Sequence, residues 1–260
     1  MYILSSQSGF NFLNALSRNQ AGVNRSIERL ATGSKLNRAS DDPSGLIAAD
    51  NIHSALTLLH ADLDNLERVD LIASTADGAL SEVVSLLTQA EGLQLQNTNN
   101  AGLSGEEKQA NNESINSIVE AVNKIFDDTS FNDQNLFDGS LHLETPGGKE
   151  LKIGKLNLQL WGETPEDRLN EIKSFRQEIS TQRGNAGAFS RIAVRSEKRY
   201  IQVSVENLTS AESLIRDTDF AKETANLIRY QTMMEASIKS LQFMRSHAKD
   251  VLALLTNTLN

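Results

Sequence analysis

Apolar residues recur at steps of three and four along both ends of the chain, and that spacing predicts long helices. In the first half these positions run from Leu56 to Leu87, and the predicted helix covers about residues 56–97. In the second half they fall seven apart from Val194 to Ile215. After a change of phase at residues 217–219 they continue with the same spacing to Leu255. Such apolar seams require partner helices along their whole length.

A first predicted helix ends near residue 34, where Gly33 is placed to close it. The next helix begins at a cluster of capping residues. Asp41, Asp42 or Ser40 can serve as its N-cap, and Pro43 fits its first turn. We therefore take Gly33, Asp41, Asp42 and Pro43 as candidate hinge and cap residues.

The middle of the chain departs from helical spacing. Ser104 and Glu107, three residues apart, form the sequence signature of a capping box and open another helix. Apolar and polar residues then alternate around the Pro-Gly-Gly sequence at 146–148. This pattern predicts a small β-hairpin or meander over about residues 131–164. Pro165 restarts the helical pattern.

These elements predict a mainly α-helical fold, an elongated antiparallel helical bundle or coiled coil with a small β-hairpin region. If the chain doubles back at the hairpin, residues 1–40 and 217–260 form a terminal helical pair, and residues 41–216 form a rod domain.

Two helices alone cannot cover their own apolar seams, so we expect the terminal pair to contact other copies of the chain. A private core within the chain is the alternative interpretation. The expected assembly interface consists of Phe10, Leu13, Val23, Ile27, Leu30, Phe220, Leu227, Met234, Ile238, Leu241, Leu252 and Leu255.

Composition narrows the class of function. Aromatic residues are only 5% of the 260 residues, which suits narrow aliphatic seams more than a globular core. The net charge is −9 and basic residues are scattered among acidic ones, so binding to nucleic acid is not expected. The chain has no cysteine for disulfides or thiolate metal sites. Neither a membrane-spanning apolar run nor a cleavable signal peptide is evident, and this favours a cytoplasmic location.

Candidate chemistry is sparse. His53 and His60 lie seven apart, roughly 10 Å along a helix, which is too far for one shared metal. The acidic pairs at 41–42 and 127–128 are explained by helix capping and a turn. No phosphate loop, nucleophile elbow or dinucleotide fingerprint occurs. We predict no catalytic residue, no cofactor and no metal site, so a small helical enzyme has no support.

Two sequence blocks carry a family resemblance. Residues 24–45 read NRSIERLATGSKLNRASDDPSG, and residues 216–227 read RDTDFAKETANL. Both blocks resemble the signatures of bacterial flagellin, in the order and near the ends where that family has them. An unrelated coiled-coil adaptor would explain the heptads but not these two blocks.

The resemblance implies the inner layers of a flagellin, with a terminal helical pair lining the filament core and a rod domain around it. It implies self-assembly into the flagellar filament, which serves motility. It also reverses the predicted location to extracellular, because flagellins leave unfolded through the flagellar type III exporter without a cleaved signal. The implied partners are the chain itself, an export chaperone, the filament cap and hook-junction proteins, with neither nucleic acid nor membrane insertion.

Three departures from the family pattern stand out. The outer variable domains are absent, because few residues separate the two helical halves, and this indicates a short form. Residues 87–96 read LTQAEGLQLQ, in which Gln89, Glu91 and Gly92 replace the charged Arg, Arg and Glu of the family pattern. We therefore expect weak recognition by the animal innate immune receptor. In the last helix, Arg245 and Lys249 make the surface more basic and bulkier than the family pattern.

The alternatives within this group of proteins are a hook–filament junction protein and a minor flagellin. Relatives of the junction protein often read SDDP, as this chain does at residues 40–43. The block at residues 216–227 favours flagellin.

Overall fold

The computed structural model describes residues 2–99 and 102–257. The chain divides into two compact units. We call residues 1–56 with 207–260 the terminal unit, and residues 57–206 the central unit. The division predicted at residues 40/41 and 216/217 stays a prediction. The two units are described separately below.

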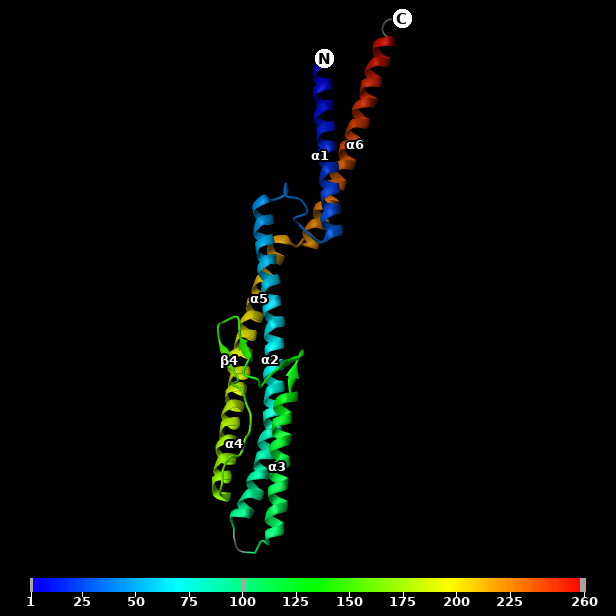
Figure 1. The fold of residues 1–260 in the computed structure, drawn as a ribbon. Coiled ribbons are helices and arrows are strands. Elements are labelled where there is room, and N and C mark those ends of the chain that lie inside the picture. Colours follow the sequence, from blue (N-terminus) through cyan, green and yellow to red (C-terminus); the bar gives the residue numbers. More distant parts are fainter. Residues whose placement is uncertain (1, 100–101, 258–260) are drawn as a thin grey trace. The chain divides into compact units, whose positions relative to one another are not determined.

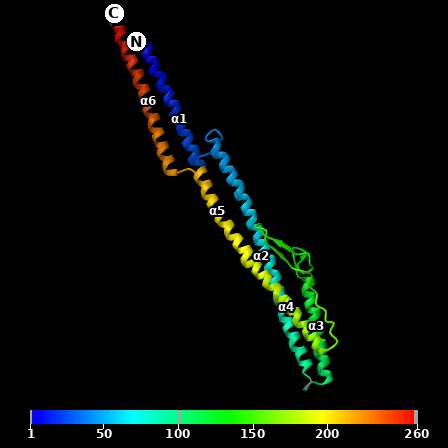
Figure 2. The same ribbon diagram turned by 90° about the vertical axis from the view of Figure 1, so that its left-hand side faces the viewer.

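Long helices dominate the described residues (Figures 1 and 2). They are α1 (Tyr2–Thr32), α2 (Pro43–Thr98), α3 (Gly105–Asp128), α4 (Pro165–Ala188), α5 (Arg195–Arg216) and α6 (Phe220–Asn257). A π-helix, η1 (Phe189–Val194), joins α4 to α5. The strands β1 (Ser130–Phe131), β2 (Gln134–Asn135), β3 (His142–Glu144) and β4 (Glu150–Lys152) form two small antiparallel sheets. The predicted mainly α-helical fold with a small hairpin region is confirmed.

Helix ends in the central unit are fixed by capping residues. The Ser104 hydroxyl accepts a hydrogen bond from the Glu107 amide at 3.2 Å, and the Glu107 carboxylate accepts one from the Ser104 amide at 2.7 Å. The predicted capping box is therefore confirmed, and it holds the pKa of the Glu107 carboxyl below its ordinary value. Thr164 and Asp167 form an equivalent box at the start of α4, where Pro165 occupies the first turn.

The core of the central unit lies where α2, α3 and α4 pack against one another and against the hairpin region. Phe126 of α3 stands edge-on to Phe137 at 5.5 Å and to Phe175 of α4 at 6.2 Å between ring centroids. Other fully buried members are Leu66, Leu80, Leu87, Ile115, Val122, Ile153, Ile172 and Ile179. The core is therefore built almost entirely from the aliphatic seams that the sequence predicts.

One window of α2 is more apolar than the sequence analysis anticipated. It has a mean hydropathy of 1.2 over 18 residues, so by length and composition this helix is able to cross a membrane, and 28% of the window is buried. The helix also supplies Leu66, Leu80 and Leu87 to the core of the central unit. Part of the apolar surface of α2 is thus used in packing within the central unit.

The hairpin of β3 and β4 matches the predicted turn. Leu143 pairs with Leu151 across the ladder, and both are buried. The Thr145 amide donates to the Lys149 carbonyl at 2.9 Å, and the Gly148 amide donates to the Thr145 carbonyl at 2.8 Å. Gly148 has φ +73°, a left-handed conformation that glycine adopts without strain. The Pro-Gly-Gly sequence is thus a turn, as predicted.

After β4 the chain keeps the predicted alternation without forming a strand. Leu156 and Leu158 are buried, and the Leu156 amide donates to the Phe137 carbonyl at 3.1 Å, but no strand among the described residues pairs with the segment. At Leu158 the side chain of Asn123 takes the place of a neighbouring strand. It accepts a hydrogen bond from the Leu158 amide at 2.8 Å and donates one to the Leu158 carbonyl at 2.9 Å. One amide side chain therefore satisfies both backbone groups where a neighbouring strand would stand.

The π-helix η1 is a feature that the heptad pattern did not predict. Phe189 and Val194 are five residues apart and both are buried. In an α-helix that separation places two side chains about 140° apart, so they could not face the same core. The wider π turn, with the Arg195 amide bonded to the Ser190 carbonyl, brings them onto one side. Ser190 also hydrogen-bonds to Asp70 of α2 through its hydroxyl.

Candidate assembly surface

In the terminal unit, α1 and α6 run antiparallel and pack against each other (Figures 1 and 2). Asn19 donates to the Ser237 hydroxyl at 3.4 Å, and Val23 is buried. At Gly22 the helices approach so closely that a β-carbon would lie 2.7 Å from the Tyr230 ring. A residue without a side chain is therefore needed at this crossing.

The helix pair also contains a buried polar cluster. Glu223 is 7% exposed, and its carboxylate accepts hydrogen bonds from the Ser26 hydroxyl at 2.6 Å and the Asn226 amide at 3.3 Å. A guanidinium nitrogen of Arg29 lies 3.8 Å from the same carboxylate. Buried polar groups need specific partners, so this cluster fixes how α1 and α6 align.

The junctions at the base of the pair lie where the sequence placed its candidate hinge. Gly33 directly follows the last residue of α1 and has φ +69°, a left-handed conformation that ends the helix. Its carbonyl accepts a hydrogen bond from the Thr218 amide at 2.8 Å, and the Lys35 amide donates to the Arg216 carbonyl at 2.7 Å. These backbone bonds tie the α1–α2 connection to the α5–α6 connection within the terminal unit. The predicted change of phase at residues 217–219 coincides with the end of α5 and the start of α6.

The start of α2 is capped by Asp42. Its carboxylate accepts hydrogen bonds from the Gly45 amide at 3.0 Å and the Ser44 hydroxyl at 2.8 Å. The Gly45 bond, followed by the Ser44 bond, holds the pKa of the Asp42 carboxyl below its ordinary value. Asp41 instead accepts a hydrogen bond from the Arg38 amide at 3.1 Å, and Pro43 is the first residue of α2. Of the three candidate caps, Asp42 therefore occupies the capping position.

The structure divides the residues expected at the assembly interface into two groups. Those facing the partner helix are buried or half-buried: Val23, Leu30, Leu227, Met234 and Leu241. The second group is exposed: Phe10 at 67%, Leu13 at 52%, Ile27 at 50%, Phe220 at 57% and Ile238 at 39%. The side chains of Leu252 and Leu255 lie outside the described residues. Whether the exposed group makes intermolecular contacts stays a prediction.

Three further exposed apolar residues of α6 escaped the sequence analysis. Ile228 is 57% exposed, Met233 49% and Phe243 63%. They lie off the heptad seam, and their apolar character at exposed positions is the signal that could have identified them. We use the term outer apolar set for Phe10, Leu13, Ile27, Phe220, Ile228, Met233, Ile238 and Phe243. Exposed apolar surface of this kind is characteristic of interaction sites.

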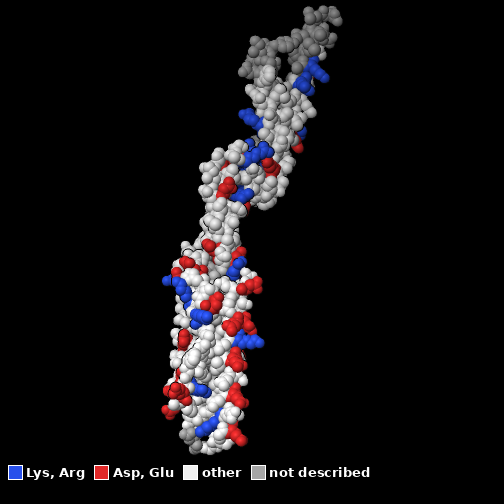
Figure 3. Space-filling view, in the orientation of Figure 1, with Lys and Arg blue, Asp and Glu red and all other residues white. Residues whose placement is uncertain are grey.

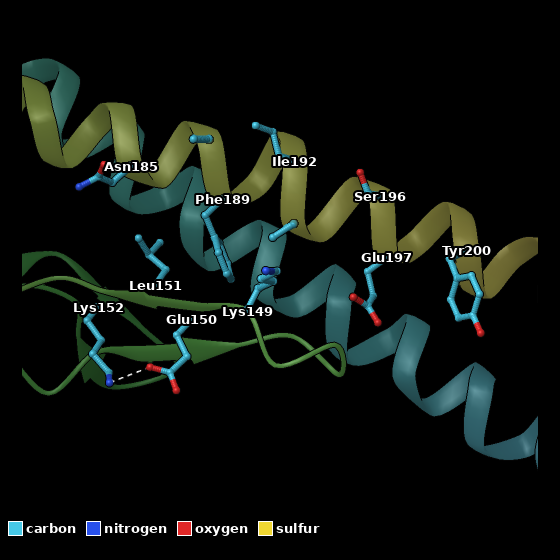
Figure 4. Close-up of a pocket in the computed structure, with 12 residues that line it drawn as sticks. Lys149, Glu150, Leu151, Lys152, Asn185, Phe189, Ile192, Ser196, Glu197 and Tyr200 are labelled. Atoms are coloured by element: carbon cyan, nitrogen blue, oxygen red, sulfur yellow. Dashed lines mark ion pairs between the residues drawn. The ribbon is translucent and has the colours of Figure 1, made fainter.

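A groove in the central unit is the candidate location for catalytic residues (Figure 4). It has a volume of about 840 Å³ and lies between the β4 region and the helices η1 and α5. Phe189 and Ile192 contribute apolar surface, whereas Glu197 and Tyr200 stand on its polar side. Ser196 also lines the groove, but within the described residues no histidine is hydrogen-bonded to it. The groove therefore lacks the paired nucleophile and base of an acyl-transfer site.

His142, Glu144 and Glu150 on the hairpin have ligand atoms within 4.8 Å of one another. All three are exposed, and the Lys152 ammonium lies 2.7 Å from the Glu150 carboxylate. The hydrogen bond and charge of Lys152 hold the pKa of the Glu150 carboxyl below its ordinary value. The lysine thus offsets the repulsion between two cross-strand carboxylates, a role that requires no metal.

A pair of terminal helices with exposed apolar side chains is typical of structural proteins that associate with copies of themselves. Comparison with known proteins identifies the family. The bacterial flagellin N-terminal helical region matches residues 3–142, and the bacterial flagellin C-terminal helical region matches residues 169–255. The chain belongs to the bacterial flagellin family.

Several similar proteins align with this chain over nearly their whole length. Flagellin of Halalkalibacterium halodurans is 30% identical, with 89% of this chain and 91% of that protein aligned. Flagellin of Bacillus subtilis is 24% identical over 95% of this chain and 97% of that protein. The flagellar filament 30.7 kDa core protein of Treponema maltophilum is 24% identical over 92% and 94% respectively. A solved structure of a flagellar hook-associated protein from Vibrio parahaemolyticus is similar with TM-score 0.42 and 14% identity, over 82% of this chain and all of that one.

The chain is therefore a short-form flagellin family member, and its function is that of a structural subunit of the flagellar filament. The resemblance identified from residues 24–45 and 216–227 is confirmed.

Proposed function

We propose that the terminal unit builds the filament by burying its outer apolar set against neighbouring copies, and that the chain carries out no catalysis. The observation that carries this proposal is the division of apolar residues on α1 and α6. One group is already used within the pair, and the other remains at 39% to 67% exposure. Fully burying one large apolar side chain stabilises an association by about 1.5–3 kcal/mol, so a set of this size is able to sustain a polymer.

The wider cellular role belongs to the same proposal. The chain leaves the cell unfolded through the flagellar exporter without a cleaved signal peptide, and the filament is extracellular. Its partners beyond itself are an export chaperone, the filament cap and hook-junction proteins. The absence of cysteine supports such a route, because folding and assembly then need no oxidation.

Recognition by the animal innate immune receptor is proposed to be weak. The matching stretch lies on α2, where Gln89 and Gly92 are exposed without carrying charge. The third differing residue, Glu91, forms an ion pair with Arg176 of α4 at 2.9 Å. That carboxylate is therefore engaged within the central unit.

The alternative is a junction protein or a minor flagellin, and seeded growth separates the possibilities. Purified chain is added to short fragments of the organism's own filaments, and filament length is followed by electron microscopy. Continuous elongation is expected for a filament subunit. Addition that stops after one or two layers would instead support a junction protein or a minor subunit.

The role of the outer apolar set is tested in the same assay with Ile228→Glu. Ile228 is 57% exposed, so the variant should keep the helical circular dichroism of the wild type while losing elongation. Gln231→Glu introduces the same new charge at an exposed position of the same helix and serves as the matched control. Normal elongation by folded Ile228→Glu would refute the proposed contact.

A further inference from the structure

The charges of the chain are unevenly distributed between its units. The net charge is −9 overall, and all of the acidic excess lies in residues 57–206 of the central unit. Acidic and basic residues are almost equal in number in the terminal unit. Copies packed side by side in a polymer would therefore repel one another through their central units, unless acidic surface on one copy faces basic surface on the next.

An acidic stripe follows the exposed side of α3. Glu106, Glu113, Glu120 and Asp127 are spaced seven residues apart and all are exposed. Seven residues correspond to about 10 Å along a helix, so the four carboxylates form one line. Figure 3 shows acidic side chains along the edge of the molecule where α3 lies in Figure 1. Lys124 is the single basic residue on the same face.

A basic stripe lies on η1 and the start of α5. Arg191, Arg195 and Arg199 are exposed and spaced four residues apart, and Lys198 lies beside them. Arg195, Lys198 and Arg199 border a shallow surface groove of about 380 Å³ together with Gln202. The buried residues Val194 and Ile201 hold the opposite side of the helix against the core. The three arginines are therefore exposed to solvent, whereas Lys198 is half-buried beside α2.

Most members of the two stripes have no ion pair among the described residues, although Glu113 accepts a hydrogen bond from the Gln109 side chain at 3.3 Å. Among the described residues, Lys198 is the one member of the basic stripe with an ion pair, to Glu67 of α2 at 2.8 Å. Arg199 donates to the Arg195 carbonyl at 3.3 Å, a contact that leaves its charge unpaired. No ion pair in the described part of the chain includes a member of the acidic stripe. In contrast, Arg176 and Arg183 of α4 are both paired with acids of α2.

We propose that the basic stripe of one copy receives the acidic stripe of a second copy of this chain. The two surfaces lie on different helices, so the contact is heterologous, and a heterologous contact that does not close on itself propagates into an open polymer. Spacing supports the pairing, since the basic stripe is roughly 12 Å long and thus matches two successive carboxylates of the acidic stripe. This inference rests on the proposed function, and it adds the central unit as a source of register between copies.

Charge reversal tests the pairing in the seeded elongation assay. Arg195→Glu/Arg199→Glu should slow elongation about tenfold or more at roughly 0.05 M salt and recover partly at roughly 0.5 M, because salt screens the new repulsion. Glu113→Lys/Glu120→Lys should slow it similarly. The quadruple variant reverses two members of each stripe and should restore elongation. Lys149→Glu/Lys173→Glu, which changes the net charge equally at exposed positions elsewhere in the central unit, is the control.

The outcomes separate this inference from the function on which it depends. A wild-type chain that fails to elongate would overturn both. Normal elongation by folded Arg195→Glu/Arg199→Glu, or equal loss in the lysine control, would overturn the stripe pairing alone. A quadruple variant that folds but stays as slow as the double variants would also overturn it, because complementary charge would then not be the interaction. Wild-type growth with rescue by the quadruple variant is the supporting result.

Discussion

The buried carboxylate of Glu223 is the most direct test of how the terminal helices are held together. In the variant Glu223→Ala, the Ser26 hydroxyl loses an acceptor at 2.6 Å, and the Arg29 guanidinium loses the negative charge at 3.8 Å. Ser26 is 1% exposed, so water does not readily replace the lost partner. Arg29 Nε is itself buried without a hydrogen-bond partner, which leaves the guanidinium more dependent on this contact.

The magnitude follows from these contacts. A hydrogen bond to a buried charged group contributes about 1.5–3 kcal/mol, and removing one member of a buried charged pair costs about 3–5 kcal/mol. Arg29 lies at the long limit of an ion pair, so we expect about 2–3 kcal/mol for Glu223→Ala. Ser26→Ala should cost less, about 1–2 kcal/mol, since the carboxylate keeps its other partners. The double variant should cost less than the sum of the two, because both remove the same bond.

Hydrogen exchange measures this effect locally. The amides of α1 and α6 around the cluster exchange when the pair opens, and about 2 kcal/mol corresponds to roughly thirtyfold faster exchange. Amides of the central unit should be unaffected. Glu235→Ala removes an exposed carboxylate from the same helix and should change exchange little. Equal exchange in Glu223→Ala and Glu235→Ala would refute the assignment of Glu223 as the residue that aligns the helices.

Two further predictions concern single polar side chains. Asn123→Ala removes both hydrogen bonds to the Leu158 backbone and should lower the free energy of unfolding of the central unit by about 2–3 kcal/mol. Urea denaturation measures this change. A loss below about 0.5 kcal/mol would show that the two hydrogen bonds are dispensable. The lowered pKa of Asp42 adds stability above the ordinary carboxyl pKa, and this stability is lost as pH falls through the folded pKa. The thermal midpoint of the wild type should therefore fall more steeply below about pH 4 than that of Asp42→Asn, with Asp50→Asn behaving like the wild type.

Much of the fold was predictable because local rules and apolar periodicity agree. The capping box at Ser104, the turn at Gly148 and the break at residues 217–219 each depend on a few adjacent residues. The π-helix η1 and the bridging role of Asn123 did not have such a signal. Each arises from contacts between residues far apart in the sequence, where tertiary packing decides the local geometry. The stripes of charge were visible in the sequence, but only the structure shows that, among the described residues, Lys198 is the one member with an ion pair.

The assembly surface shows why a heptad seam alone does not define an interface. An apolar seam indicates that a helix face is covered, and it does not indicate whether the cover comes from the same chain or from another copy. Leu227 belongs to the seam and is half-buried in the helix pair, whereas the next residue, Ile228, is 57% exposed. Consecutive side chains on an α-helix point about 100° apart, so the two face different partners. Leu227→Glu should therefore open the helix pair and accelerate amide exchange in α1. Ile228→Glu should leave amide exchange unchanged and block only the contact between copies.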